Sequence, residues 1–306
     1  MLKPRAPKAG RPIAAARALL ALAAILMLPG CSLLSRGFLG AAGPIAFAER
    51  HEFIIVCIVL LFVMAPVFIL TPFIAWHYRL SNTKSAFRPN WGFSWFLEVL
   101  IWVPPTLIVI GLSFLLYNNT IRLDPYRPLP APANEKPLDI ETVALDWKWL
   151  FIYPAQHIAT VNQLVLPVGR PVHFALTSGT VMQSLLIPQL AGQIYAMAGM
   201  RTELNLMATH PATYWGENTQ FNGNGFQNEK FPVHAVSASD FAQWVKHTQA
   251  NPRQLDTVAY QSLSRQSTLS HPLAFGATEP GIFERILHQQ ITPGYLSQHA
   301  ESKPNA

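Results

Sequence analysis

Residues 53–76 read FIIVCIVLLFVMAPVFILTPFIAW, and this run decides the architecture of the chain. The run contains no charged side chain, and a helix of this length crosses a bilayer with some tilt. A second apolar run covers residues 91–117 and contains one ionisable residue, Glu98, and the pair Pro104-Pro105. We therefore expect a hairpin of two transmembrane helices, at 53–76 and 91–117.

The loop at 77–90 joins the two runs and indicates their orientation. It carries Arg79, Lys84 and Arg88 but no acidic residue. Short loops rich in Lys and Arg remain on the cytoplasmic side of a membrane. The sequence therefore predicts a cytoplasmic loop, with both the mature N-terminus and the long C-terminal segment outside the inner membrane.

A secretory leader precedes the first run. Residues 1–30 combine five basic side chains with an apolar stretch that is too short to span a bilayer. The sequence Leu28-Pro29-Gly30-Cys31 then resembles a bacterial lipobox, in which a lipidated cysteine becomes the first mature residue. We expect a lipoprotein signal peptide at 1–30, lipidation (palmitate) at Cys31 and a periplasmic segment at 31–52. The alternative is an uncleaved leader in which Cys31 is incidental.

The net charge and the cysteine count exclude several functions. The chain has 22 Lys and Arg against 16 Asp and Glu, but five of the basic groups lie in the leader, which leaves 17 against 16. A nucleic-acid partner is therefore not indicated. Cys31 and Cys57 are the only cysteines, and we expect Cys57 to be inert packing within the first helix. The segment after residue 117 thus lacks the thiols needed for a disulfide framework, a thiol nucleophile or a thiolate copper site.

The period of the pattern changes after a proline-rich linker at 118–137. Apolar and polar side chains then alternate at 143–151, 172–176 and 202–206, and glycine-containing turns separate these runs. Short alternating strands over roughly 100 residues favour an all-β sandwich, here at 138–237. Beyond it, residues 238–306 show helical patterns, so we expect a helical C-terminal region and tail.

This organisation resembles subunit II of the haem-copper terminal oxidases, whose exported sandwich has the cupredoxin fold. Residues 146–154, DWKWLFIYP, look like the aromatic stretch of that family. Ile187-Pro188, followed by QIYAMAGMR at 193–201, resembles the quinol-oxidase branch of cytochrome bo type. The resemblance covers most of residues 50–250. It implies a membrane-anchored chain with a two-helix transmembrane hairpin, an all-β cupredoxin-like sandwich and a C-terminal helical tail.

The resemblance also implies that a copper centre has been lost. Relatives that oxidise cytochrome c hold two copper ions with cysteine, histidine and methionine side chains and a glutamate carbonyl. The first histidine position falls here on Gln183. The second ligand cluster, aligned on Gln220 and Phe231, falls on Phe221, Gly223, Gly225, Glu229 and Pro232. All the side-chain ligands are missing and the remaining histidines are scattered, so we expect no metal and no cofactor in this chain.

Three further side chains are candidates for a role. Trp147 and Trp149 share their alternation with Val143 and Phe151, which predicts packing in the core or at a subunit interface rather than electron transfer. Glu98 lies within the second apolar run near its cytoplasmic end, where an ionisable group often marks a proton path. The resemblance implies that Glu98 contributes to proton entry into a channel of subunit I; the alternative is that it snorkels or satisfies a partner helix.

The function implied by the resemblance is that of a non-catalytic subunit II in a proton-pumping ubiquinol oxidase of the bacterial inner membrane. Such an enzyme complex reduces oxygen to water, with ubiquinol as substrate and with haem and copper in subunit I. The expected partners are subunit I, the other oxidase subunits and membrane lipid, but neither cytochrome c nor nucleic acid. Two alternatives remain open: a cytochrome c oxidase subunit II with a copper electron-entry centre, and a membrane-tethered binding or assembly lipoprotein.

Overall fold

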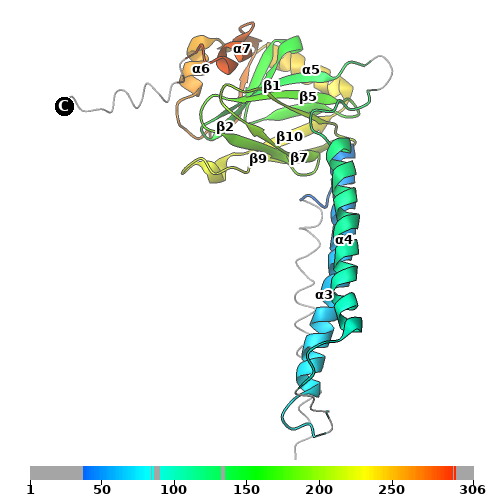
Figure 1. Cartoon of the computed structure of the whole chain (residues 1–306). Coiled ribbons are helices and arrows are strands. Elements are labelled where there is room, and N and C mark those ends of the chain that lie inside the picture. The colour runs from blue at the N-terminus through cyan, green and yellow to red at the C-terminus, as the bar shows by residue number, and fades with distance from the viewer. Residues whose placement is uncertain (1–36, 84, 86–89, 132–134, 292, 294–306) are drawn as a thin grey trace, which may run out of the picture.

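The computed structural model describes residues 37–83, 85, 90–131, 135–291 and 293, and it shows a long helical hairpin joined to a β-sandwich (Figure 1). The expected signal peptide, Cys31, Lys84, Arg88 and most of the tail beyond residue 291 lie outside the described residues. The membrane-anchored fold class inferred from the sequence, with its sandwich and C-terminal helices, is confirmed within the described part of the chain.

The hairpin consists of α3 (Pro44–His77) and α4 (Trp95–Arg122), which run side by side away from the sandwich (Figure 1). Both are long and apolar enough to cross a membrane, since each contains an 18-residue stretch of high mean hydropathy, 3.3 in α3 and 2.3 in α4. Pro44 starts α3, at a position where a missing N–H leaves no hydrogen bond unmade. On the sandwich side, both helices extend beyond the apolar runs. Each helix therefore reaches the sandwich without a break.

The sandwich consists of two mixed sheets. The six-stranded sheet has the order β12-β3-β2-β1-β5-β8. The five-stranded sheet has the order β4-β10-β9-β6-β7. Their bounds are β1 Leu138–Leu145, β2 Lys148–Tyr153, β3 Ile158–Val161, β4 Leu164–Pro167, β5 Val172–Ser178, β6 Gln183–Ile187, β7 Ala191–Ala196, β8 Thr202–Leu206, β9 Ala212–Asn218, β10 Lys230–Val236 and β12 Leu273–Phe275.

The aromatic stretch of β2 fills the space between the sheets. Phe231 of β10 packs against Trp149 and Phe151, with ring centroids 6.2 and 5.0 Å apart. The Tyr153 hydroxyl donates to the Val165 carbonyl at 3.1 Å and accepts from the Val165 N–H at 3.0 Å, so its polar end is satisfied within the core. These contacts tie β2 to the opposite sheet through β4 and β10.

The C-terminal region contains α5 (Ala238–Gln249), α6 (Thr257–Leu263) and α7 (Ile282–Leu287), and also the short pair β11 (Gln254–Leu255) and β13 (Ala277–Thr278). α5 packs beside β4 and contributes Phe241 to the core between the sheets, whereas α6 and α7 cover the outer face of the six-stranded sheet. A second apolar cluster forms there, between side chains of β1 and β2 and those of α6 and α7. The region is therefore less purely helical than the sequence suggests, since β12 also joins the main sheet beside β3.

The alternation of the first two strands corrects one expectation. Val143 faces the C-terminal region whereas Trp149 and Phe151 face the space between the sheets, so these side chains do not share one face. The reason is the two-residue turn Asp146-Trp147, which brings Leu145 and Lys148 opposite each other in the ladder. A chain reversal of this kind resets the inward and outward alternation.

Candidate functional site

The end of the sandwich where the sequence predicts the vacated ligand positions is built from three chain segments. They are the β1–β2 turn, the start of β6 with the loop before it, and the long β9–β10 connection, which contains the short helix η2 (Phe226–Asn228). Gln183, Glu229 and Gly225 all lie at this end of the sandwich. We call the side chains of Asp146, Trp147, Lys148, Gln183, Asn218, Asn222 and Glu229 the polar cluster.

Gln183 occupies the expected first-histidine position and is fully buried. Its Nε2 donates to the Leu145 carbonyl at 3.1 Å and to Thr180 Oγ1 at 3.3 Å. The next residue, Ser184, donates its backbone N–H to Asn218 Oδ1 at 3.0 Å. Two amide side chains thus cross-link this end of the sandwich: Gln183 joins the start of β6 to the end of β1, and Asn218 joins it to the end of β9.

Glu229 occupies the position expected for the second histidine and is 1% exposed. Its Oε2 accepts from Asn218 Nδ2 at 2.9 Å and from Asn222 Nδ2 at 2.8 Å, whereas its Oε1 is enclosed without a hydrogen-bond partner among the described residues. Burial raises the pKa of Glu229 to about 7, although the two amide donors act in the opposite direction. The carboxyl group therefore changes its charge near neutral pH.

Lys148 carries a positive charge near the carboxyl groups of Asp146 and Glu229. Its role was not predicted from the sequence. Its ammonium group is buried and donates to the Arg265 carbonyl and to Ser267 Oγ, both at 2.7 Å. Burial lowers the pKa of Lys148 to about 8, while the nearby carboxylates of Asp146 and Glu229 act to raise it. A lysine inside an otherwise apolar strand is the signal that could have pointed to this role.

Trp147 fills the place expected for the second cysteine. It has a positive φ of 64° in the turn, and its Nε1 lies 3.4 Å from the Asn222 carbonyl as a long donor contact. A Cβ atom added to Gly225 would lie 2.0 Å from Cδ2 of the indole. Gly223, with φ of 113°, lies in van der Waals range of the same ring. The indole therefore stacks where a thiolate side chain would need to enter.

Two of the expected ligand positions do not join the cluster. Phe221 is 72% exposed and packs edge-on against Phe226 at 5.7 Å. Pro232 alternates in β10 with the buried residues Phe231 and Val233, so its ring lies on the outer face of the sheet. The inward position at this point of the strand is Phe231, which packs against Trp149.

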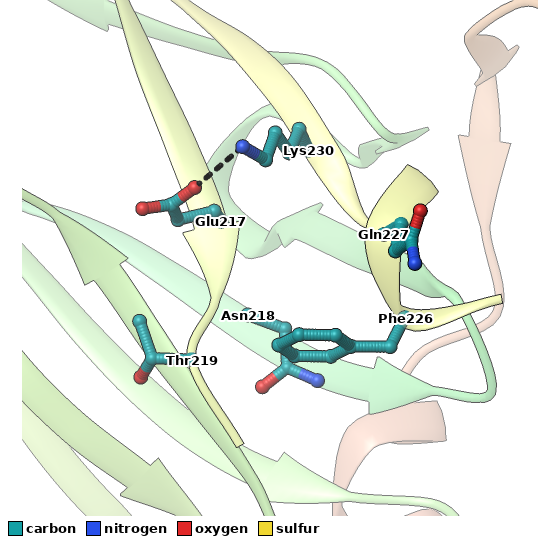
Figure 2. Close-up of a pocket in the computed structure, with 6 residues that line it drawn as sticks. All are labelled: Glu217, Asn218, Thr219, Phe226, Gln227 and Lys230. Atoms are coloured by element: carbon teal, nitrogen blue, oxygen red, sulfur yellow. Dashed lines mark ion pairs between the residues drawn. The ribbon is translucent and has the colours of Figure 1, made fainter. Parts of the chain in front are cut away.

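A surface pocket of about 600 Å³ borders the cluster. Figure 2 shows the ion pair between Lys230 and Glu217 (3.2 Å) on one side of this pocket and Phe226 and Asn218 on the other. Asn218 both lines the pocket and binds Glu229, so its amide connects the pocket to the buried carboxyl group.

The residues at this end do not fit a copper centre. Copper in such sites needs soft thiolate and imidazole ligands, whereas the chain places amides, a carboxylate, a buried ammonium and an indole here. Within the described ranges, no group of three or more His, Cys, Asp or Glu side chains could hold a metal ion. His173 is half-buried, and its two ring nitrogens pair with the carboxylates of Asp139 (3.1 Å) and Glu203 (3.5 Å).

The remaining candidates are placed as follows. Trp149 is fully buried between the sheets. Glu98 lies in the first turn of α4, at the end of the hairpin far from the sandwich, and its Oε2 accepts from Trp102 Nε1 at 3.1 Å. The lipidation candidate Cys31 lies outside the described residues.

The class of protein follows from the fold and from a family comparison. Residues 137–236 match the model of the family described as cytochrome c oxidase subunit II, periplasmic domain. The chain is thus a membrane-anchored protein with a cupredoxin-like domain of the oxidase subunit II class.

Full-length relatives narrow this class. The chain is 43% identical to "Ubiquinol oxidase subunit 2" of Acetobacter aceti, over 87% of this chain and 85% of that protein. It is 40% identical to "Cytochrome bo(3) ubiquinol oxidase subunit 2" of Pseudomonas putida, over 86% and 82%, and 37% identical to "Quinol oxidase subunit 2" of Bacillus subtilis (strain 168), over 84% and 79%. The chain belongs to the ubiquinol oxidase subunit 2 family.

Proposed function

We propose that this chain is subunit II of a proton-pumping ubiquinol oxidase, which oxidises ubiquinol, reduces oxygen to water and moves protons across the bacterial inner membrane. The observation that carries the proposal is the filled ligand end of the sandwich, where the Trp147 indole stacks on Gly225 beside the amide-bound Glu229. A domain of this kind has no entry point for electrons from cytochrome c. Haem, copper and the quinol site then belong to subunit I, and this chain carries no redox centre.

The chain's own role is to clamp and cover subunit I. The five-stranded sheet lies on the side of the sandwich from which the hairpin descends (Figure 1). Trp215 of β9 is 60% exposed there, and Phe221 in the following loop is 72% exposed. Large exposed aromatic side chains are enriched where proteins meet. We assign this face to the periplasmic surface of subunit I, while α3 and α4 hold the chain beside it in the membrane.

Purification of the complex through a tag on this chain tests the proposal. Co-eluting haem and oxygen uptake driven by ubiquinol are expected, because the partner subunit holds the redox groups. A haem-free product would instead support a tether or assembly lipoprotein. Loading of the purified complex with copper provides the second arm, and a purple two-copper spectrum from this chain would contradict the proposal.

Glu98 is proposed to contribute to proton entry at the cytoplasmic end of the hairpin. The position within an apolar helix supports this role, since ionisable groups there face protein or water. Its contact with the Trp102 indole (3.1 Å) keeps the carboxyl group in one orientation.

Replacement of Glu98 separates a proton role from a packing role. We expect both Glu98→Ala and Glu98→Gln to slow proton uptake and turnover about tenfold or more, because neither side chain exchanges a proton near neutral pH. Trp102→Phe is the matched control, since it removes the hydrogen bond to the carboxyl group but leaves its proton chemistry. Wild-type turnover and pumping in the Glu98→Gln complex would refute this role.

A further inference from the structure

We propose that one water molecule binds between the two sheets, at the end of the sandwich that holds the polar cluster, and links Trp149, Gln183 and Glu229. It accepts a hydrogen bond from Trp149 Nε1 and donates one each to Gln183 Oε1 and Glu229 Oε1. The inference rests on the sandwich alone and does not depend on the proposed oxidase function.

Three enclosed polar atoms carry the proposal. Trp149 and Gln183 are 0% exposed, and Glu229 is 1% exposed. Trp149 Nε1, Gln183 Oε1 and Glu229 Oε1 have no hydrogen-bond partner among the residues that the structure describes. An unpaired buried polar atom is unfavourable, and nearly all such atoms in folded proteins are bonded either to protein or to ordered water. A shared bound molecule would supply partners for all three atoms.

Gln183 and Trp149 enter the same part of the core from facing sheets. Gln183 of β6 pairs in the ladder with the buried Ala196, so its side chain points between the sheets. Trp149 of β2 also faces this space, and its partner in the ladder is Ala144. The residue after Ala144 is Leu145, whose carbonyl oxygen accepts from Gln183 Nε2 at 3.1 Å. The two side chains are therefore neighbours.

Glu229 is held at the same place by two contacts. It lies two positions before Phe231, whose ring packs against that of Trp149 with the centroids 6.2 Å apart. Asn218 connects its carboxyl group to β6: Nδ2 of the amide donates to Glu229 Oε2 at 2.9 Å, and Oδ1 accepts from the backbone N–H after Gln183 at 3.0 Å. One amide therefore holds the carboxyl group of Glu229 beside the start of β6.

The hydrogen-bonding role of each unpaired atom is fixed. Gln183 Nε2 uses both of its hydrogens, toward the Leu145 carbonyl at 3.1 Å and toward Thr180 Oγ1 at 3.3 Å. Exchange of the amide oxygen and nitrogen would place two oxygens against each other at Leu145, so Oε1 remains the acceptor. An indole nitrogen only donates, and a carboxylate oxygen only accepts. The site therefore offers one donor and two acceptors.

One water molecule matches this set. Its oxygen accepts from the indole N–H and its two hydrogens reach the two oxygens, which gives the three bonds that a buried water commonly makes. A cation would satisfy the oxygens of Gln183 and Glu229, but it has no lone pair for the N–H of Trp149. Lys148 also places a positive charge near Glu229, which disfavours a second cation.

An experimental structure of the full-length chain, purified with the proteins that bind it, tests the site directly at a resolution that shows ordered water. We expect one density peak at about 2.7–3.2 Å from each of the three atoms, the usual length of a hydrogen bond. A map without this peak overturns the proposal. Direct contact between Glu229 Oε1 and Gln183 Oε1 would also overturn it, because a protonated carboxyl group would then bond the amide without water.

A second structure separates water from a cation. It is determined in a buffer whose monovalent cations are replaced by thallium, which scatters far more strongly than water. The peak between the three atoms should keep its height, because water does not exchange for a cation. A peak that grows in thallium would identify a cation site, and the proposal would be wrong.

A double-mutant cycle tests the shared water in solution, through the equilibrium constant for unfolding of the full-length chain. Trp149→Phe removes the N–H donor, and Gln183→Met removes the acceptor but keeps the length of the side chain. Because both groups bind the same water, the double variant should raise the constant about tenfold less than the product of the two single effects. Effects that simply multiply would contradict the proposal.

Thr180→Val is the matched control for this cycle. Thr180 binds the amide nitrogen of Gln183 and not the oxygen that faces the water. Its effect should therefore multiply with that of Trp149→Phe. The same coupling in both cycles would mean that packing, and not a shared water, connects Trp149 with its neighbours.

Discussion

Position 225 requires a glycine because a neighbouring ring leaves no room for a side chain, and not because of the backbone conformation. Gly225 has an ordinary right-handed φ of −88°, which any residue adopts, but the Trp147 indole occupies the space of a Cβ atom. In relatives with copper, a cysteine is expected here. The stacked indole thus leaves no room for a larger side chain at position 225.

The steric role of Gly225 leads to a stability prediction. Gly225→Ala should lower the free energy of unfolding by about 1–3 kcal/mol, because the added methyl group overpacks against the indole. Thermal unfolding of the full-length chain measures this effect. Gly92→Ala is the control, since a Cβ atom there meets no atom within 4 Å. In a Trp147→Ala background the effect of Gly225→Ala should vanish, and an undiminished effect would contradict the stacking argument.

The polar cluster predicts a specific dependence of stability on pH. The pKa of Glu229 is raised from 4.5 to about 7, so the folded state holds a proton that the unfolded state has released between these values. Stability contributed by that proton is fully present below about pH 4.5 and is lost as the pH rises through 7. The loss is on the order of a few kcal/mol, because each tenfold difference in affinity for the proton contributes about 1.4 kcal/mol.

Glu229→Gln tests this dependence by denaturant unfolding at several pH values. The variant should lose less stability than the wild type between about pH 5 and pH 7, because glutamine keeps a neutral polar side chain that does not titrate. Lys148 acts in another window: its pKa is lowered to about 8, so its contribution to stability grows as the pH rises from 8 to 10.5. Parallel pH profiles of wild type and Glu229→Gln below pH 7 would show that Glu229 titrates normally.

At the scale of elements, α6 and α7 cover the outer face of the six-stranded sheet. Phe283 of α7 is 1% exposed within the second apolar cluster, and the Arg201 guanidinium lies over its ring at 5.7 Å. Lys148 adds a polar tie by donating to Arg265 and Ser267 in the segment after α6. The outer face of β1 and β2 is therefore core, not surface.

Removal of the Phe283 ring tests the lid. Phe283→Ala should destabilise the domain by about 3–5 kcal/mol, the usual range for a fully buried aromatic side chain. Val258→Ala in α6 is the matched control, because Val258 is 72% exposed and its truncation should change stability by less than about 0.5 kcal/mol. Unfolding of both variants in the same detergent provides the comparison, and equal stability would mean that α7 is dispensable.

At the scale of the whole molecule, the chain divides into a hairpin of two helices that are apolar enough to cross a membrane and a β-sandwich. The basic loop at 77–90 predicts that the end of the hairpin far from the sandwich lies in the cytoplasm, with the sandwich on the other side of the membrane. Thr83→Cys and Glu135→Cys, each combined with Cys57→Ser, report the two sides. A thiol reagent that cannot cross the membrane should label position 135 in intact spheroplasts and should label position 83 only after lysis. Labelling of both positions from outside would contradict the hairpin.

The expected lipidation of Cys31 also concerns how the whole molecule is anchored in the membrane. Cys31→Ser should leave insertion and labelling unchanged, because two membrane helices anchor the chain without an acyl group. Failure of the variant to insert would show that the lipid is required.

The sequence by itself determined the hairpin, the sandwich and the absence of a cysteine after residue 57. Apolar length decides whether a helix spans a bilayer, and a domain without cysteine has no thiolate ligand, so neither inference needed coordinates. Strands with clear alternation could also be predicted from the sequence. The three-residue strand β12 could not be predicted, because so short a segment shows no period.

Only the tertiary structure decided which side chains gather around Gln183 and Glu229. Lys148, Asn218 and Asn222 come from separate segments, and the two-residue turn before Lys148 reverses the alternation on which the sequence argument relied. Their roles depend on distances between side chains far apart in the chain, which no local pattern contains.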